Sequence, residues 1–324
     1  MELNTKINLL RTMILIREFE NFVGAAKFRN EIMGQVHCCT GQEAVVVGTC
    51  AALEKSDYVI SNHRSHGHVL AKGANLNAIM AEMYGKATGT NGGKGGSMHI
   101  FDKEVGSICT TAIVGSGLPI GCGSAFASKF KNDGKVTVVF LGDGATNEGT
   151  FGECMNLASS LKLPIIFLLE NNGIAITTHF HKVTIQTEIF LRAKAFGIKS
   201  VQINGHDVEE VYNNVKVAIE SIKNGDGPMF IEVKTTRFSE HFEGAHFAKI
   251  AKLGYRDSAK IEELKITSDP IVTFLNKLLH SRLLTNDDFE QIVKEEKEKV
   301  AKAFQFAFES PVPDINMAYT NIFV

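Results

Sequence analysis

Apolar residues in this chain recur in two patterns, one helical and one typical of buried strands. Residues 4–28 place apolar side chains three and four positions apart, which predicts an opening amphipathic helix. Short apolar runs have instead the length and composition of strands, and they stand at 58–60, 136–141, 165–169, 198–203 and 229–233. Helical segments separate most of these runs. That alternation predicts an α/β fold with a parallel sheet flanked by helices.

The remaining patterns complete the expected organisation. Further helices are predicted at 43–53, 78–84, 119–130, between the runs at 136–141 and 165–169, and at 270–279 and 287–308. Asp207 has the side chain of an N-cap for a helix that runs to about Ile222. Segment 85–97 is too rich in glycine for a regular element, and it lacks the spacing of a nucleotide-binding phosphate loop. Without a repeat or linker, we expect one domain over residues 1–324, which ends in a helical tail over 255–324.

Composition and charge narrow the possible functions. The 324 residues are 44% hydrophobic and 22% charged, which suits a globular protein with a sizeable core. A formal net charge of −2 gives no reason to expect nucleic acid or an anionic membrane as a partner. No apolar run approaches the roughly 20 residues that span a bilayer. Six cysteines without CxxC spacing predict neither a zinc site nor a disulfide framework, so we expect reduced, mostly buried thiols.

Two polar motifs directly follow neighbouring strands of the predicted sheet. Gly142-Asp143-Gly144 follows the run at 136–141, and Asn171–Asn172 follows the run at 165–169, with 26 residues between the motifs. In a βαβ unit both strands point the same way, so both motifs reach the carboxyl edge, where open α/β folds bind ligands. A carboxylate and an amide oxygen beside glycines suit a hard cation that holds a diphosphate. Each motif alone is also ordinary turn chemistry, so the prediction depends on the joint pattern.

The spacing is that of the thiamine-diphosphate motif, and other segments extend the likeness. They are Thr40-Gly-Gln-Glu-Ala44, His63-Arg-Ser-His-Gly67, Gly95-Gly-Ser-Met-His99, Ile113-Val-Gly115, Gly142-Asp-Gly-Ala-Thr-Asn-Glu-Gly149, Lys162-Leu-Pro164 and Glu170-Asn-Asn172. In this order the chain resembles the α subunit of the E1 component of 2-oxo acid dehydrogenase complexes, the pyruvate and acetoin dehydrogenase group in particular. The likeness extends from about residue 8 to about residue 310.

The resemblance implies the diphosphate-type thiamine-diphosphate-binding fold, with thiamine diphosphate and Mg²⁺ as cofactors. Asp143, Asn172 and the backbone carbonyl of Ile174 are then the metal ligands. The expected cofactor contacts are Arg64, His63, Ala112, Val114, Gly142, Asp143, Gly144, Ala145, Asn172 and His241. Arg64 is the candidate clamp, because guanidinium binds phosphate bidentately. Ala112 and Val114 match positions that meet the aminopyrimidine through backbone atoms, and their side chains are expected to pack in the core.

By the same resemblance, His37, His63 and His241 are the candidate catalytic residues. Imidazole can pass protons near neutral pH, although a lone histidine is more often structural. The family often has tyrosine at the position of His63. A departure from tyrosine there is familiar from the acetoin-like branch of the family, so the identity of the substrate stays open. Ser239 and Phe242 replace the first histidine and the phosphorylated serine of the mitochondrial pyruvate enzymes, so kinase control is not expected. No role is assigned to His66, His68, His99 and His246, and His68 and His99 are expected to be structural.

The resemblance also implies partners. In this family a glutamate on a separate β subunit faces the aminopyrimidine, so we expect an α₂β₂ heterotetramer with the cofactor between the subunits. The expected acyl acceptor is an E2 lipoyl acyltransferase, and the expected substrate is a 2-oxo acid or acetoin. The N-terminus has no signal or transit pattern, and we expect a cytoplasmic protein. Two alternatives stay open: a related thiamine enzyme subunit that makes or breaks a C–C bond without lipoamide, and a non-catalytic paralogue that serves as a binding subunit.

Overall fold

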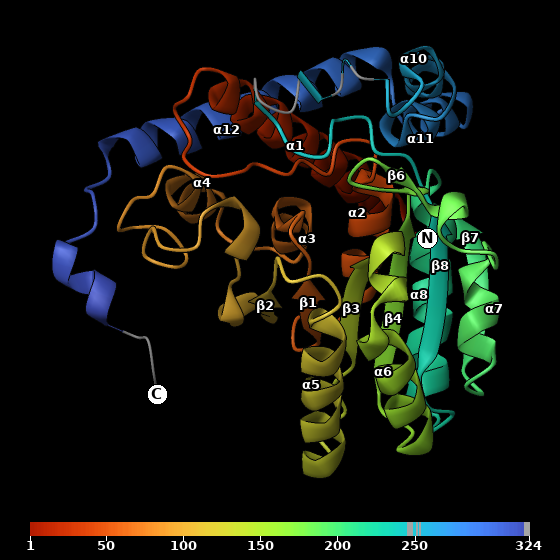
Figure 1. Cartoon of the computed structure of the whole chain (residues 1–324). Helices are drawn as coiled ribbons and strands as arrows, with labels where there is room; N and C mark the ends of the chain where they lie inside the picture. Colours follow the sequence, from red (N-terminus) through yellow and green to blue (C-terminus); the bar gives the residue numbers. More distant parts are fainter. Residues whose placement is uncertain (245–248, 251, 253, 321–324) are drawn as a thin grey trace.

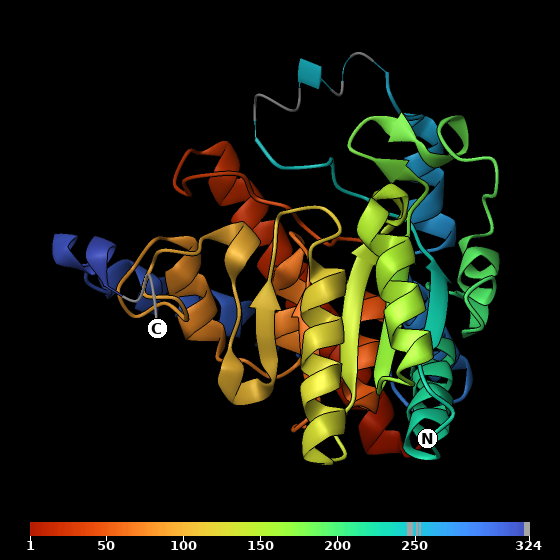
Figure 2. The ribbon, with the colours of Figure 1, turned by 60° about the horizontal axis from the view of Figure 1, so that its bottom comes forward.

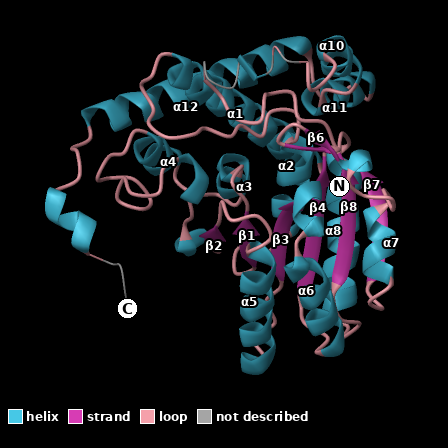
Figure 3. Ribbon diagram, in the orientation of Figure 1, coloured by secondary structure: helices cyan, strands magenta, loops and turns pink. Residues whose placement is uncertain are grey.

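A six-stranded parallel sheet forms the centre of the computed structural model, which describes residues 1–244, 249–250, 252 and 254–320 (Figures 1 and 3). Its strands, in the order in which they pair, are β2 (Ser107–Thr110), β1 (Tyr58–Ser61), β3 (Thr137–Gly142), β4 (Ile165–Asn171), β8 (Met229–Lys234) and β7 (Lys199–Asn204). The five predicted strands are confirmed, and β2 adds a sixth. The predicted α/β class with a parallel sheet is therefore confirmed.

Helices cover both faces of the sheet, which explains why the strands read as continuous apolar runs. In β3, Val138 and Phe140 pack toward α2 (Glu43–Ala52) and α8 (Val208–Lys223). Val139 and Leu141 pack toward the opposite face, beneath α5 (Gly117–Lys131) and α6 (Gly149–Ser160). A further short helix, α7 (Ile189–Lys194), lies beside β7 on the α5 and α6 side (Figure 1).

A helical layer lies behind α2 and carries a third apolar cluster. The long first helix, α1 (Leu3–Phe28), crosses α2 and packs against the final long helix, α12 (Asn286–Glu309), as Figures 1 and 2 show. Helix α12 also packs on α4 (Leu76–Met83). Two shorter helices, α10 (Ser258–Thr267) and α11 (Pro270–His280), precede α12. The predicted helices at 270–279 and 287–308 are thus confirmed, and the end of the chain ties back to its beginning.

The sequence pattern missed only short elements. These are β2, α3 (Ser65–Ala71), α7, α10, the hairpin of β5 (Ile174–Ala175) with β6 (Thr178–His179), and single-turn 3-10 helices at 97–99, 103–105, 143–147, 180–182 and 315–319. Each is too brief, or too uniformly buried or exposed, to show a period. The cap at Asp207 is confirmed, because its carboxylate accepts the N–H groups of Glu209 and Glu210. Among the residues described, no helix is long and apolar enough to cross a membrane.

Prediction for α5. A Cβ at Gly121 would lie 2.0 Å from Val139 Cγ2, whereas a Cβ at Gly123 meets nothing within 4 Å. Gly121→Ala should therefore destabilise the chain by about 1–3 kcal/mol through overpacking. Gly123→Ala, its control in the same helix, should stabilise it by roughly 0.5–1 kcal/mol, because alanine loses less backbone entropy. Urea unfolding midpoints measure both, and equal midpoints for the two variants would contradict this packing.

Candidate active site

The carboxyl ends of the parallel strands open into one cleft, and nearly all the predicted site residues line it. The lining includes His63, Arg64, Ala112, Val114, Gly142, Asp143, Gly144, Ala145, Asn172, Ile174 and His241. His37 is not among the lining residues and lies directly behind His63 and His241, with ring centroids 4.8 and 5.0 Å away. Residues spread from position 37 to position 241 are thus gathered at one edge of the sheet.

Asp143 is held at the end of β3 with one carboxylate oxygen unused. It begins a short 3-10 helix, Asp143–Asn147, and is 2% exposed. Its Oδ2 atom is buried and has no hydrogen-bond partner among the residues described. Burial raises the pKa of Asp143 to about 6. A buried oxygen without a partner costs free energy, and a divalent cation would satisfy it, so this residue fits the implied metal.

The end of β4 supplies the amide of Asn172, and β5 follows it close to Gly144. Asn172 follows β4 directly, and its Oδ1 accepts the Ile174 N–H at 3.3 Å. Across the cleft floor Gly144 lies against β5, where a Cβ would come within 2.8 Å of Ala175. Glycine is thus required at 144, because the Ala175 side chain fills the space that another side chain would need. The arrangement leaves oxygen donors and backbone around the same floor, as a cation with a diphosphate requires.

Arg64 ties two distant segments together inside the cleft. Its guanidinium donates from Nη1 to the Cys38 carbonyl at 2.7 Å and from Nη2 to the His241 carbonyl at 2.8 Å. Nη2 also lies 3.2 Å from His241 Nδ1. Arg64 is 5% exposed, and burial lowers its pKa. Two of its nitrogens therefore already serve the protein, and the buried positive charge remains available to an anion.

The three histidines form a compact neutral cluster. One ring nitrogen from each of His37, His63 and His241 lies within 4.8 Å of the others. Burial and the Arg64 cation lower the pKa of all three, that of His241 to about 3 and those of His37 and His63 well below the ordinary range. His37 Nδ1 and His63 Nε2 are buried with no partner in the part of the chain that is described. Near pH 7 these rings are neutral, so each can offer one donor and one acceptor nitrogen.

Two lining or neighbouring residues were not predicted from sequence. Glu170, at the end of β4, lines the cleft and accepts hydrogen bonds from Asn62 Nδ2 at 3.0 Å and from His68 Nε2 at 3.3 Å. Arg237, just beyond β8, is 2% exposed, and burial followed by the nearby Arg64 charge lowers its pKa to about 9. Glu170 lies at the end of β4 and Arg237 lies just after β8, at the same edge of the sheet, so the strand-end rule used for Asp143 would have found both.

Other expectations have mixed outcomes. Val114 is 56% exposed, so its expected core packing is wrong: the loop before α5 turns this side chain outward at the cleft. His68 is fully buried and bonded to Ser61 and Glu170, in agreement with its expected structural place. All six cysteines are free thiols, and only Cys109 is not buried, as expected. His246 lies outside the described residues, as does part of the loop predicted over 237–249.

Comparisons with known proteins agree with this geometry. Residues 11–316 match the family model described as the dehydrogenase E1 component. The chain is 40% identical to the α subunit of the acetoin:2,6-dichlorophenolindophenol oxidoreductase of Bacillus subtilis, over 98% of this chain and 92% of that protein. It is 38% identical to the pyruvate dehydrogenase E1 component subunit alpha of Rhizobium meliloti, over 96% and 88%. A Cupriavidus necator acetoin oxidoreductase α subunit is 36% identical, over 99% and 94%.

Prediction for Asp143. Because its pKa is about 6 without metal, a cation must displace a proton below that pH. The affinity for Mg²⁺ with thiamine diphosphate should therefore fall by about tenfold per pH unit below 6 and level off above it. Calorimetry from pH 5 to pH 8 measures this. Asp143→Asn is the control, because it removes the titrating carboxyl group. Any pH dependence that remains then comes from the diphosphate of the cofactor. A slope shared by both proteins would contradict the role of Asp143.

Proposed function

The chain belongs to the dehydrogenase E1 component family, and on that premise we propose that it is the α subunit of an E1 enzyme acting on a 2-oxo acid, pyruvate-like, or on acetoin. Members of this family are thiamine-diphosphate-dependent oxidoreductases, and an α subunit implies a β partner. The observation that carries the proposal is the shared cleft, where an unsatisfied buried carboxylate faces the same space as a cluster of neutral histidines and a buried arginine.

The floor of the cleft would hold the cofactor's charged end. We propose that Asp143, Asn172 and the Ile174 carbonyl bind Mg²⁺, and that Gly142, Gly144 and Ala145 present backbone to the diphosphate. Asp143 supports this assignment because its buried Oδ2 has no partner among the described residues, and Gly144 supports it because the Ala175 side chain leaves no room there for a Cβ. Arg64 adds positive charge inside the cleft, and the buried Arg237 adds a second positive charge near Asp143. Ala112 and Val114 lie where the loop before α5 meets the cleft and would contact the aminopyrimidine.

The histidines would manage protons beside Arg64, whose Nη2 lies 3.2 Å from His241 Nδ1. Bound thiamine diphosphate supplies the nucleophilic carbon and the electron sink for cleavage next to a carbonyl. We propose that His63 and His241 face the reacting atoms, each as a neutral ring that donates one N–H and accepts at its other nitrogen. His37 supports them from behind, with its Nδ1 free to take part. Their lowered pKa values mean that a proton taken up is readily returned, because burial and then the Arg64 charge disfavour the imidazolium.

The cleft also supports a split site. The acidic residues that line it, among those described, are Asp143 and Glu170, and Glu170 is already engaged by Asn62 and His68. The carboxylate that activates the aminopyrimidine would therefore come from the β subunit. Apolar side chains are exposed at the cleft, with Ile113, Val114 and Ile176 at 71%, 56% and 54%. Exposed apolar surface of this kind suits a covering subunit.

We propose an α₂β₂ assembly and an E2 lipoyl acyltransferase as acceptor, as in 2-oxo acid dehydrogenase complexes. Residues 1–324 would then act as one cofactor-binding domain, with residues 255–324 as a helical tail. The packing of α12 against α1 supports this single unit.

Prediction for the isolated chain. With thiamine diphosphate and Mg²⁺ alone, the purified chain should not turn over pyruvate, acetoin or branched 2-oxo acids, and adding its β subunit should restore turnover. The reason is the missing carboxylate. A dye-reduction assay of the chain, the β subunit and their mixture measures this. Equal turnover by the isolated chain would overturn the split site, and an inactive mixture on all three substrate classes would overturn the proposed reaction.

Prediction for His241. In the reconstituted pair, His241→Ala should lower kcat by about 100-fold, within the range of a lost acid–base group. Cofactor affinity should change much less, because the cation ligands are untouched. Steady-state kinetics and calorimetry separate the two effects. His280→Ala is the control, because that residue lies on α11, away from the cleft, and bonds only the Asn276 carbonyl among the contacts described. Equal losses of kcat and cofactor affinity would argue against a catalytic His241.

A further inference from the structure

A buried chain of hydrogen bonds runs from the first helix to the backbone of His37. Glu20 Oε2, on α1, lies 2.8 Å from His66 Nδ1, and His66 Nε2 lies 2.8 Å from Ser97 Oγ. Ser97 Oγ in turn accepts the His37 N–H at 3.3 Å. None of the four residues is more than 3% exposed. His66 received no role in the sequence analysis, and neither Glu20 nor Ser97 lines the cleft.

Only one assignment of protons satisfies every group in this chain. Glu20 uses both of its oxygens in buried hydrogen bonds, Oε1 with the Cys39 N–H and Oε2 with His66 Nδ1, as a carboxylate does. A carboxylate only accepts, so His66 must carry its proton on Nδ1 and accept at Nε2. The Ser97 hydroxyl then donates to Nε2 and accepts from His37. If His66 were doubly protonated, the Ser97 hydroxyl hydrogen would lose this acceptor.

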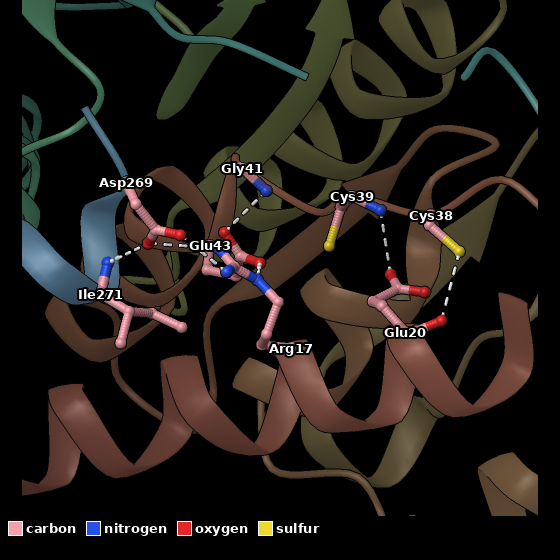
Figure 4. Close-up of polar contacts among 8 residues, drawn as sticks. All are labelled: Arg17, Glu20, Cys38, Cys39, Gly41, Glu43, Asp269 and Ile271. Carbon is pink, nitrogen blue, oxygen red and sulfur yellow. Dashed lines mark hydrogen bonds and ion pairs between the residues drawn. The ribbon is translucent and has the colours of Figure 1, made fainter. Parts of the chain in front are cut away.

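The same carboxylate also holds the far end of the segment. Glu20 Oε1 accepts the Cys39 N–H at 3.0 Å, as Figure 4 shows. Between the two anchors, the Cys38 carbonyl accepts from Arg64 at 2.7 Å. Residues 37, 38 and 39 are thus each held at the backbone by a buried side chain, two of them through Glu20.

A parallel set of contacts fixes the next turn. Glu43 accepts the Gly41 N–H at 2.9 Å and pairs with Arg17, which also reaches Asp269 at 2.8 Å (Figure 4). The backbone of residues 37–41 therefore lies along α1 and is hydrogen-bonded to two buried carboxylates, those of Glu20 and Glu43. Helix α1 itself packs against α12, so these backbone anchors are tied to the helical layer.

This backbone anchoring matters because the His37 side chain has few bonds of its own. Within the described residues its buried Nδ1 has no hydrogen-bond partner, and its ring meets His63 and His241 edge-on with centroids 4.8 and 5.0 Å away. We propose that Glu20, His66 and Ser97 are positioning residues that fix His37, and through it the histidine cluster, in the geometry that the reaction needs. The inference rests on the proposed function, because it concerns the same site. Small displacements of such groups are costly, up to about 100-fold in rate for 1 Å.

Ser97→Ala tests the proposal in the reconstituted α/β enzyme. It removes the hydroxyl that joins His66 to His37 and leaves the Glu20–His66 bond in place. We expect kcat to fall by about 10-fold or more, with KM and cofactor affinity within about threefold of the parent. Ser128→Ala is the matched control, because Ser128 is equally buried, at 3%, and its hydroxyl has no described partner. It should leave all three quantities unchanged.

A second variant and a second readout keep the test decisive. In Glu20→Gln the new amide would donate to His66 Nδ1, and His66 Nε2 would then donate to Ser97 instead of accepting from it. The Ser97 hydroxyl would lose its acceptor, so we expect kcat to fall as it does in Ser97→Ala. Hydrogen exchange of the α/β complex should show faster exchange in peptides over residues 36–40 in Ser97→Ala, which removes the acceptor of the His37 N–H, with unchanged exchange around Asp143. Parent-like kcat in both variants with parent-like exchange in Ser97→Ala would overturn the proposal, as would losses of kcat, cofactor affinity and Tm in parallel. If the parent pair is inactive on every substrate, the proposed function fails, and the exchange data alone decide on the positioning.

Discussion

Parallel pairing of β3 with β4 is the constraint on which the site depends. Register places Gly142 opposite Glu170, so the residues that follow both strands leave the sheet at the same level. Asp143 and Asn172 consequently face one cleft although their positions in the chain are far apart. A shift of one residue would turn either side chain into the core or away from the cleft. Burial of the strands on both faces, by α5 and α6 on one side and α2 and α8 on the other, opposes such a shift.

Among the residues described, the buried charged groups at the cleft lack partners of opposite charge that a bound ligand would supply. Arg64 and Arg237 are buried cations with lowered pKa values, and Asp143 is a buried acid with a raised one. Each would be more stable beside an opposite charge, since burying an unpaired ion costs several kcal/mol. A diphosphate with a divalent cation offers both signs at once. The folded chain therefore carries an electrostatic cost that its cofactor would relieve, and cofactor binding would stabilise the fold.

The strands of the sheet were predictable because buried strands are continuous apolar runs, as at 165–169. The start of α8 was predictable because the Asp207 side chain can cap a helix. Short pieces such as β2 and α3 carry too few residues for a period. At the site, resemblance pointed to residues that now lie together, from Arg64 to His241. The chain Glu20–His66–Ser97 could not have been predicted, because its members lie on α1, α3 and a glycine-rich loop whose contacts depend on tertiary packing. Neither could the outward turn of Val114, which depends on the path of one loop.

The contacts of Arg64 bear on the order in which parts of the chain fold during synthesis. Its guanidinium links the Cys38 carbonyl to the backbone of His241, so the histidine cluster closes over a loop of some two hundred residues. Contacts this far apart form late, since the entropy of bringing the ends together must be met first. On the ribosome, β1 and β3 can pair while residue 241 has yet to be translated. The histidine cluster therefore closes late, and a nascent chain halted before β8 would lack His241, the residue that we propose handles protons.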